Sequence, residues 1–332
     1  MGTKLKAIMS GKDISLSDLA GKTIAVDAFN WIFQFLTTIR LADGSYLTDK
    51  QGRVTTHLNG LFYRSMNLLY NRIKPVFVFD GEAPKFKKKT LEERQTMKKE
   101  ALSKSEAAST NEEKAMYLKR AAYIDNYIVD SSKQLLSLLG IPVVQAPAEG
   151  EAQAAKLSAD SLVYAAASQD YDTFLFGAKR VVRNLNITNR RKISRKGITT
   201  GVNPEIFESE NSLKKLGITR EKLIVIALFS GTDYNTGVNG IGPKKALSLV
   251  KKESVDKLLA AYDFGSSYDV REIYEYFLNP NVLELKQLPP QGHIDKAGLV
   301  SFMCDEHGFE TDRISSAVEK LDTSQGSLND YG

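Results

Sequence analysis

The chain has 332 residues, of which 42% are hydrophobic and 26% are charged, and its formal net charge is +5. This composition is typical of a globular protein with one or two domains, and the mild basicity is compatible with a polyanionic partner. The single cysteine, Cys304, excludes a disulfide within the chain, so we expect a reducing, intracellular location. No apolar run is long enough to span a membrane, and the opening MGTKLK is not typical of a signal peptide.

Strand-like and helical stretches alternate through the first part of the sequence. Helical spacing of apolar residues covers 31–41 and 56–70. Apolar runs typical of strands cover 23–29, 75–80, 141–147, 161–170 and 180–187. This alternation predicts an α/β fold with a mainly parallel central sheet flanked by helices. From about residue 204 the pattern becomes almost wholly helical.

Residues 85–125 form a segment that is dense in charge and poor in aliphatic side chains. Composition alone favours a solvated pair of surface helices. The alternative is a mobile basic element that lies over a cleft.

Acidic residues stand at or just after the ends of four predicted strands. Because the carboxyl ends of parallel strands meet at one edge of a sheet, we expect these side chains to converge there. One acid alone would be an ordinary helix cap or turn residue, but six at one edge are harder to explain that way. The six are Asp27, Asp80, Glu149, Glu151, Asp170 and Asp172, and Asp233 in FSGTDYN is a seventh candidate.

An all-oxygen set of this kind favours Mg²⁺ or Mn²⁺ over zinc. The three histidines, His57, His293 and His307, fall outside the acidic set, which further disfavours zinc. Seven acids exceed what one Mg²⁺ needs, so the sequence predicts two ions per site.

Two basic elements are candidates for phosphate contacts. Lys87 and Arg94 are seven residues apart, so on a helix they would face the same way and could grip a scissile phosphate. Spacing alone does not distinguish them from ordinary surface cations. The second element is NGIGPKKA, in which a glycine turn precedes a helix that starts at a proline, a pattern suited to holding a phosphate. Its candidate DNA-binding residues are Gly240, Gly242, Lys244 and Lys245.

Taken together, these segments resemble the flap endonuclease family of structure-specific 5′ nucleases, and most closely its archaeal branch. The resemblance runs over nearly the whole chain through IAVDAFNWIFQFL, GLFYRSMNLL, VFVFDGEAPKFKKK, LLGIPVVQAPAEGEAQAA, ASQDYDTFLFGA, GTDYN and GIGPKKAL. It implies a PIN-like 5′-nuclease fold with a helical arch and a C-terminal helical region that contains a helix–hairpin–helix.

The resemblance also implies roles for individual residues. Lys87 and Arg94 would be catalytic cations at the foot of the arch. Phe33 stands where the family often has a tyrosine that stacks on a base, so stacking would be kept and the hydroxyl lost. Gly2 would lie near the active site. The first metal would be held by Asp27, Asp80, Glu149 and Glu151, and the second by Asp170, Asp172 and Asp233.

Other parts of the resemblance concern DNA and a protein partner. Residues 85–125 match the arch and its cap, through which a 5′ single strand passes, and Lys119 and Arg120 would line it. Residues 239–246 match the element that holds the downstream duplex with the help of a monovalent cation, commonly K⁺. The tail SQGSLNDYG resembles a binding box for the sliding clamp, PCNA, in which Gln325, Leu328 and Tyr331 fit. Gly332 stands where a second aromatic residue is expected, which would weaken the box.

We expect one nuclease domain over residues 1–322, followed by a tail over 323–332. Within the domain, an N-terminal nuclease region would cover about 1–130, an internal nuclease region about 131–235, and the helix–hairpin–helix region about 219–252.

The sequence thus predicts a monomeric, Mg²⁺-dependent 5′ flap endonuclease that also has 5′–3′ exonuclease activity and acts on branched DNA in replication and repair. Its expected location is the cytoplasm and nucleoid, or the nucleus if the source is eukaryotic. A sister 5′–3′ exonuclease or a bubble or junction nuclease is one alternative, although the compact arch disfavours a bubble-cutting relative. A small ribonuclease with a related acidic site is a second alternative, against which the GIGPKKA element argues. A non-catalytic DNA scaffold is a third, against which the intact acidic set argues.

Overall fold

The computed structural model describes residues 4–186, 191–193, 198–200 and 202–326. A seven-stranded sheet forms its centre, in the order β1-β9-β6-β5-β2-β3-β4. The five strands from β6 to the edge strand β4 are parallel, and β9 runs antiparallel to both β6 and β1. The strands are β1 (Lys12–Asp13), β2 (Thr23–Asp27), β3 (Lys74–Phe79), β4 (Val143–Gln145), β5 (Ala165–Ala167), β6 (Arg180–Arg183) and β9 (Glu205–Glu208). A separate two-stranded antiparallel sheet pairs β7 (Arg191–Ile193) with β8 (Ile198–Thr200).

The expected α/β fold is therefore confirmed, and all five predicted strands are present, although the third and the fourth are each only three residues long. The expectation of an almost wholly helical sequence beyond residue 204 is wrong at β9, which is a strand. Both β9 and the two-residue β1 owe their structure to pairing with distant parts of the chain. Local periodicity carries no signal for such pairing.

Side chains of the central strands point alternately to two hydrophobic cores, one on each face of the sheet. Ile24 and Val26 of β2 are buried in one core, whereas Ala25 between them is buried in the other. Helices α1 (Ala28–Thr38), α2 (Thr56–Tyr70) and α5 (Asn126–Leu138) cover the first face, together with α13 (Lys296–Val300), a π-helical turn (Ser301–Glu306) and α14 (Thr311–Gly326).

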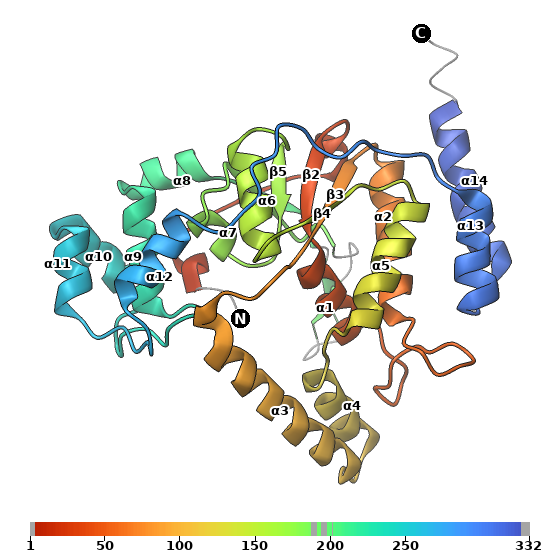
Figure 1. Ribbon diagram of the computed structural model, residues 1–332, viewed down its shortest axis with the longest axis horizontal. Coiled ribbons are helices and arrows are strands. Elements are labelled where there is room, and N and C mark those ends of the chain that lie inside the picture. The colour runs from red at the N-terminus through yellow and green to blue at the C-terminus, as the bar shows by residue number, and fades with distance from the viewer. Residues whose placement is uncertain (1–3, 187–190, 194–197, 201, 327–332) are drawn as a thin grey trace.

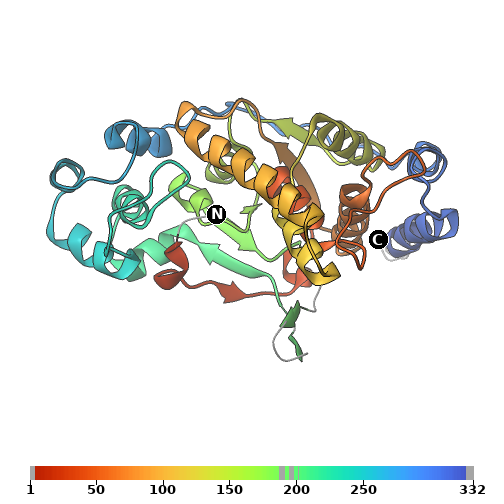
Figure 2. The same cartoon turned by 90° about the horizontal axis from the view of Figure 1, so that it is seen from below.

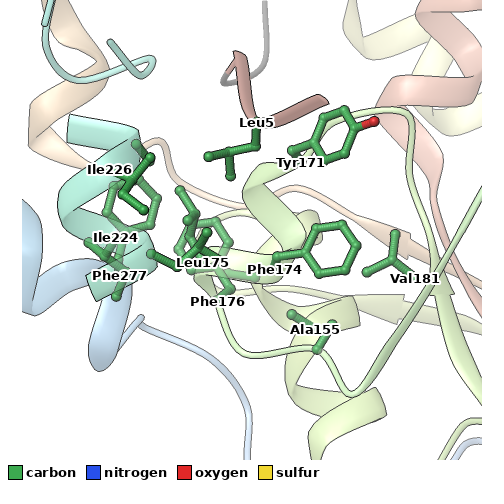
Figure 3. Close-up of a cluster of buried hydrophobic side chains, with 14 of the residues drawn as sticks. Leu5, Ala155, Tyr171, Phe174, Leu175, Phe176, Val181, Ile224, Ile226 and Phe277 are labelled. Atoms are coloured by element: carbon green, nitrogen blue, oxygen red, sulfur yellow. The ribbon is translucent and has the colours of Figure 1, made fainter. Parts of the chain in front are cut away.

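The second core joins the sheet to a group of helices at one end of the molecule. Figure 3 shows side chains of α7, α9 and α12 meeting there, among them Leu175, Ile224 and Phe277. This packing fixes the C-terminal helices relative to the carboxyl edge of the sheet. The helices that contribute to the second core or pack around it are α6 (Gly150–Ala159), α7 (Asp172–Leu175), α8 (Ser209–Leu216), α9 (Arg220–Ser230), α10 (Pro243–Lys252), α11 (Val255–Ala261) and α12 (Val270–Leu278).

A helical pair projects from the body on the side where α1 begins (Figures 1 and 2). It consists of α3 (Lys88–Glu106), which follows a short 3₁₀ turn (Lys85–Lys87), and α4 (Asn111–Arg120). The two helices pack on each other, and no described side chain of α4 is buried. The segment is thus a solvated helix pair, as its composition favoured, and its root adjoins the carboxyl edge of the sheet. No helix among the described ranges is long and apolar enough to cross a membrane.

Candidate active site

The six acids predicted to converge do meet at the carboxyl edge of the parallel strands. Asp27 ends β2 and also caps α1, because its carboxylate accepts the Asn30 N–H at 3.0 Å. Asp80 follows β3 and accepts the Gly150 N–H at 2.8 Å. The other four lie on helices and loops that begin at the same edge: Glu149 and Glu151 at the start of α6, Asp170 between β5 and α7, and Asp172 as the first residue of α7.

These acids are close enough to influence one another's ionisation. Burial raises the pKa of Asp27 to about 8, and the negative charges of Asp80 and Asp170 add to the effect. Burial also raises the pKa of Asp80, with a contribution from Glu149. The pKa of Glu151 is raised well above its usual value, first by burial and then by Asp172, Asp170 and Asp27. Such a site favours positive charge, which would relieve both the desolvation and the repulsion.

Both predicted catalytic cations reach this cluster from the root of the helical pair. Lys87 forms an ion pair with Glu149 Oε1, and Arg94 Nη2 lies 2.8 Å from Asp233 Oδ2. Burial disfavours the charge on Lys87, but the surrounding carboxylates, first Glu149 and then Asp233 and Asp80, outweigh it, so the pKa of Lys87 is raised and the ammonium stays charged. Asp233, which follows α9, lies near enough to the cluster for its charge to help raise the pKa of Lys87.

The donor set suits a divalent cation in its chemistry: it consists of carboxylates, and the buried Oδ1 of Asn30 beside Asp27 and Asp170 has no hydrogen-bond partner. The carboxylates do not form a metal site that is already arranged for binding. Within the described ranges, no group of three or more His, Cys, Asp or Glu side chains stands in metal-ligating geometry. One reason is that Glu149 and Asp233 are turned toward Lys87 and Arg94, while Glu151 accepts hydrogen bonds from Thr173. The ligand roles of the seven acids therefore remain predictions.

Several residues that organise the site had not been singled out from the sequence. Tyr234 and Tyr276 both donate their hydroxyls to Glu149 Oε2. Burial and the neighbouring Glu149 raise the pKa of Tyr234 well above its usual value, so its hydroxyl keeps its proton. The only local signal was adjacency: Tyr234 follows Asp233, Gly150 separates the two glutamates, and Thr173 follows Asp172.

The remaining predicted DNA-contacting residues lie on the surface around the cluster. Phe33 on α1 is 46% exposed, as stacking on a base would require. Lys119 and Arg120 are exposed in the last turn of α4. Gly2 lies outside the described residues.

The glycine turn before α10 has the predicted conformation. Gly240 has a φ of +75°, and Gly242 is the N-cap of α10. Lys244 and Lys245 are exposed on the first turn of the helix, and Lys245 donates to the Gly240 carbonyl at 2.9 Å. A hollow of about 550 Å³ opens beside the turn, lined by Phe229, Ser230 and residues 236–242.

The predicted clamp-binding residues are scarcely covered by the structure. Gln325 lies in the last turn of α14. Leu328 and Tyr331 lie outside the described residues.

Comparisons with known proteins identify the family. The XPG N-terminal domain matches residues 3–101, and the XPG I-region matches residues 140–233. Flap endonuclease 1 of Thermococcus onnurineus is 48% identical over 328 residues, which cover 97% of this chain and 94% of that protein. This chain belongs to the flap endonuclease 1 family. The resemblance drawn from the sequence is thus confirmed.

Solved structures agree with this assignment. The flap endonuclease-1 from Methanococcus jannaschii is 37% identical, covers 98% of this chain and 100% of its own, and superposes with a TM-score of 0.76. The catalytic core of Rad2 in complex with DNA substrate is 25% identical, covers 97% of this chain and 100% of its own, and has a TM-score of 0.72. The flap endonuclease fold therefore extends over almost the whole chain, the C-terminal helices included.

Proposed function

We propose that this chain is a divalent-metal-dependent 5′ flap endonuclease, with 5′–3′ exonuclease activity, that cuts branched DNA in replication and repair. The observation that supports this most directly is the meeting of seven acids with Lys87 and Arg94 at the root of a projecting helical pair. Family membership supplies the reaction class. Two Mg²⁺ ions, for which Mn²⁺ could substitute, would when bound activate the attacking water and stabilise the leaving oxygen.

The chain's own residues would position the scissile phosphate and neutralise its charge. Lys87 and Arg94 would exchange their carboxylate partners for phosphate oxygens and stabilise the charge that develops during cleavage. Phe33 would stack on a base beside the cut. The exposed cations at the end of α4, Lys119 and Arg120, would line the path of the 5′ single strand, and Gly2 would lie beside the active site.

Duplex binding would use the turn before α10. Gly240, Gly242, Lys244 and Lys245 would contact the phosphates of the downstream duplex, with K⁺ held in the adjacent hollow. Such contacts do not read bases, so binding should be insensitive to sequence and sensitive to salt.

The remaining parts of the proposal concern organisation and partners. We assign one nuclease domain to residues 1–322, with the regional boundaries given above, and a tail to 323–332. Gln325, Leu328 and Tyr331 would bind the sliding clamp, weakly because of Gly332. The protein would act as a monomer in the cytoplasm and nucleoid, or in the nucleus of a eukaryote.

The test is a cleavage assay on a 5′-labelled double-flap DNA, with blunt, nicked, bubble and single-stranded DNA as controls. We expect Mg²⁺-dependent cleavage at the base of the flap, much slower reaction on the controls and none in excess chelator. Faster cleavage of the bubble or of the nicked end would instead identify a sister nuclease, and binding without cleavage would identify a scaffold.

A further inference from the structure

Glu149 is held from three directions by side chains that come from distant parts of the chain. Lys87 pairs with its Oε1, while its Oε2 accepts the hydroxyls of Tyr234 and Tyr276, the latter at 3.1 Å. The Glu149 side chain is only 9% exposed and that of Lys87 only 18%. Tyr276 is 127 residues away from Glu149 and lies outside both segments matched by the family models.

Tyr276 is itself firmly placed by the second core. The next residue of α12, Phe277, is fully buried, and its ring lies 5.1 Å from that of Phe176 (Figure 3). The rings of Tyr234 and Tyr276 meet edge to face with centroids 5.7 Å apart. This geometry allows both hydroxyls to approach the same carboxylate oxygen.

The same aromatic group also holds the backbone next to Lys87. Phe86, the residue before it, packs against Tyr276 at 5.7 Å and against Tyr268 at 5.3 Å between ring centroids. Tyr268 in turn donates its hydroxyl to the Lys85 carbonyl at 2.8 Å. The segment around α12 thus contacts Glu149 directly and also the two residues that precede Lys87.

We propose that Tyr276, together with Tyr234, is a positioning residue that holds Glu149 against Lys87. The two tyrosines would thereby fix the position of the Lys87 ammonium before the scissile phosphate binds. The proposal rests on the flap-cleaving function proposed above. A carboxylate held by two hydroxyls has one orientation, whereas without them the Glu149 side chain can rotate and take the lysine with it. Because a lysine side chain is long and flexible, the placement of its ammonium depends on the carboxylate to which it is paired, which for Lys87 is Glu149.

The decisive variant is Tyr276→Phe, which keeps the ring packing and removes only the hydroxyl. Tyr262→Phe is the matched control. Tyr262 also packs edge to face on a buried phenylalanine, Phe229, but it is not one of the tyrosines that donate to Glu149. We expect Tyr276→Phe to lower the single-turnover rate on a double flap about tenfold, as loss of an outer hydrogen-bond partner commonly does. DNA affinity in chelator should change less than about twofold, and Tyr262→Phe should match the wild type in both.

Two further measurements distinguish positioning from a general structural role. Lys87 should react faster with a dilute acetylating reagent in the metal-free Tyr276→Phe protein, by about threefold relative to Lys88 on the same peptide, because a lysine that is no longer held against its partner is more accessible. The extent of acetylation is read by mass spectrometry. In a Lys87→Ala background, Tyr276→Phe should lower the rate far less than tenfold, since coupled residues are not additive. Tyr234→Phe should behave like Tyr276→Phe in both measurements.

The outcomes separate this proposal from the one on which it rests. If the wild type cuts flaps and Tyr276→Phe matches it in rate and in Lys87 labelling, the positioning role is overturned. A tenfold loss that persists in full in the Lys87→Ala background overturns it as well, because Tyr276 would then act through another group. Failure of the wild type to cut any flap refutes the proposed function instead, while the labelling experiment still reports whether Tyr276 holds the Lys87–Glu149 pair.

Discussion

Gly150 is a residue at which a single added carbon atom should damage the site. It begins α6 between two of the acids, and its N–H donates to Asp80 Oδ1 at 2.8 Å. A Cβ built there would lie 2.7 Å from that oxygen and 3.1 Å from the Val78 carbonyl of β3. Ordinary contact begins at 3.4 Å, so Gly150→Ala requires the Asp80 carboxylate to retreat by about 0.7 Å.

A displacement of that size is large for a catalytic group, since a misplacement of about 1 Å can lower a rate about 10²-fold. We therefore expect Gly150→Ala to cut a double flap about 10²-fold more slowly in single turnover. Stability should change little, because alanine favours a helix by up to about 1 kcal/mol over glycine and offsets part of the strain. Gly150→Ser adds the same Cβ and should lose as much.

The assay compares the two Gly150 variants with Ala159→Gly, which alters backbone freedom at the other end of the same helix. Cleavage rate, Mg²⁺ midpoint and urea unfolding are measured for each. We expect Ala159→Gly to lose stability but to keep its cleavage rate. Wild-type rates and Mg²⁺ midpoints in both Gly150 variants would show that the close approach of Gly150 to Asp80 has no bearing on catalysis.

Four further predictions follow from the same structure. Lys87→Ala should lower the single-turnover rate by about 10²- to 10³-fold with little change in DNA affinity, and an unchanged rate would remove Lys87 from the catalytic set. Replacing Lys244 and Lys245 by alanine should weaken binding to all duplexes alike and reduce the salt slope by about 2, measured by fluorescence anisotropy; a loss confined to some sequences would contradict phosphate contact. Excess chelator should abolish cleavage and added Mg²⁺ restore it, whereas full activity in chelator would refute the role of the acids. Burial, together with the nearby His307, lowers the pKa of His57 from 6.5 to about 3. The unfolded state therefore binds a proton at His57 that the folded state does not, so the protein loses stability as the pH falls below 6.5, by about 2 kcal/mol at pH 5. In urea titrations at several pH values, His57→Gln should remove this loss of stability, whereas replacement of the exposed His293 by glutamine should not. If the free energy of unfolding of His57→Gln still falls with pH as steeply as that of the wild type, another group causes the acid sensitivity.

The sequence by itself determined the strands that build the site and the acids that follow them. The runs before Asp27 and Asp80 are continuous and apolar because both faces of a central parallel strand are buried, and this pattern is local. The helical spacing of Lys87 and Arg94 and the glycine turn at Gly240 are local in the same sense. Motifs of this kind also carried the family resemblance.

Only the tertiary structure decided which of these groups touch one another. Pairing of Lys87 with Glu149, the approach of Tyr276 to the same carboxylate and the narrow space at Gly150 join positions that are far apart in the chain. The edge strands β1 and β9 likewise exist only because distant backbone groups pair with them. Periodicity reports which face of an element is buried, but the partner on that face is chosen by the packing of the whole chain, which no local stretch encodes.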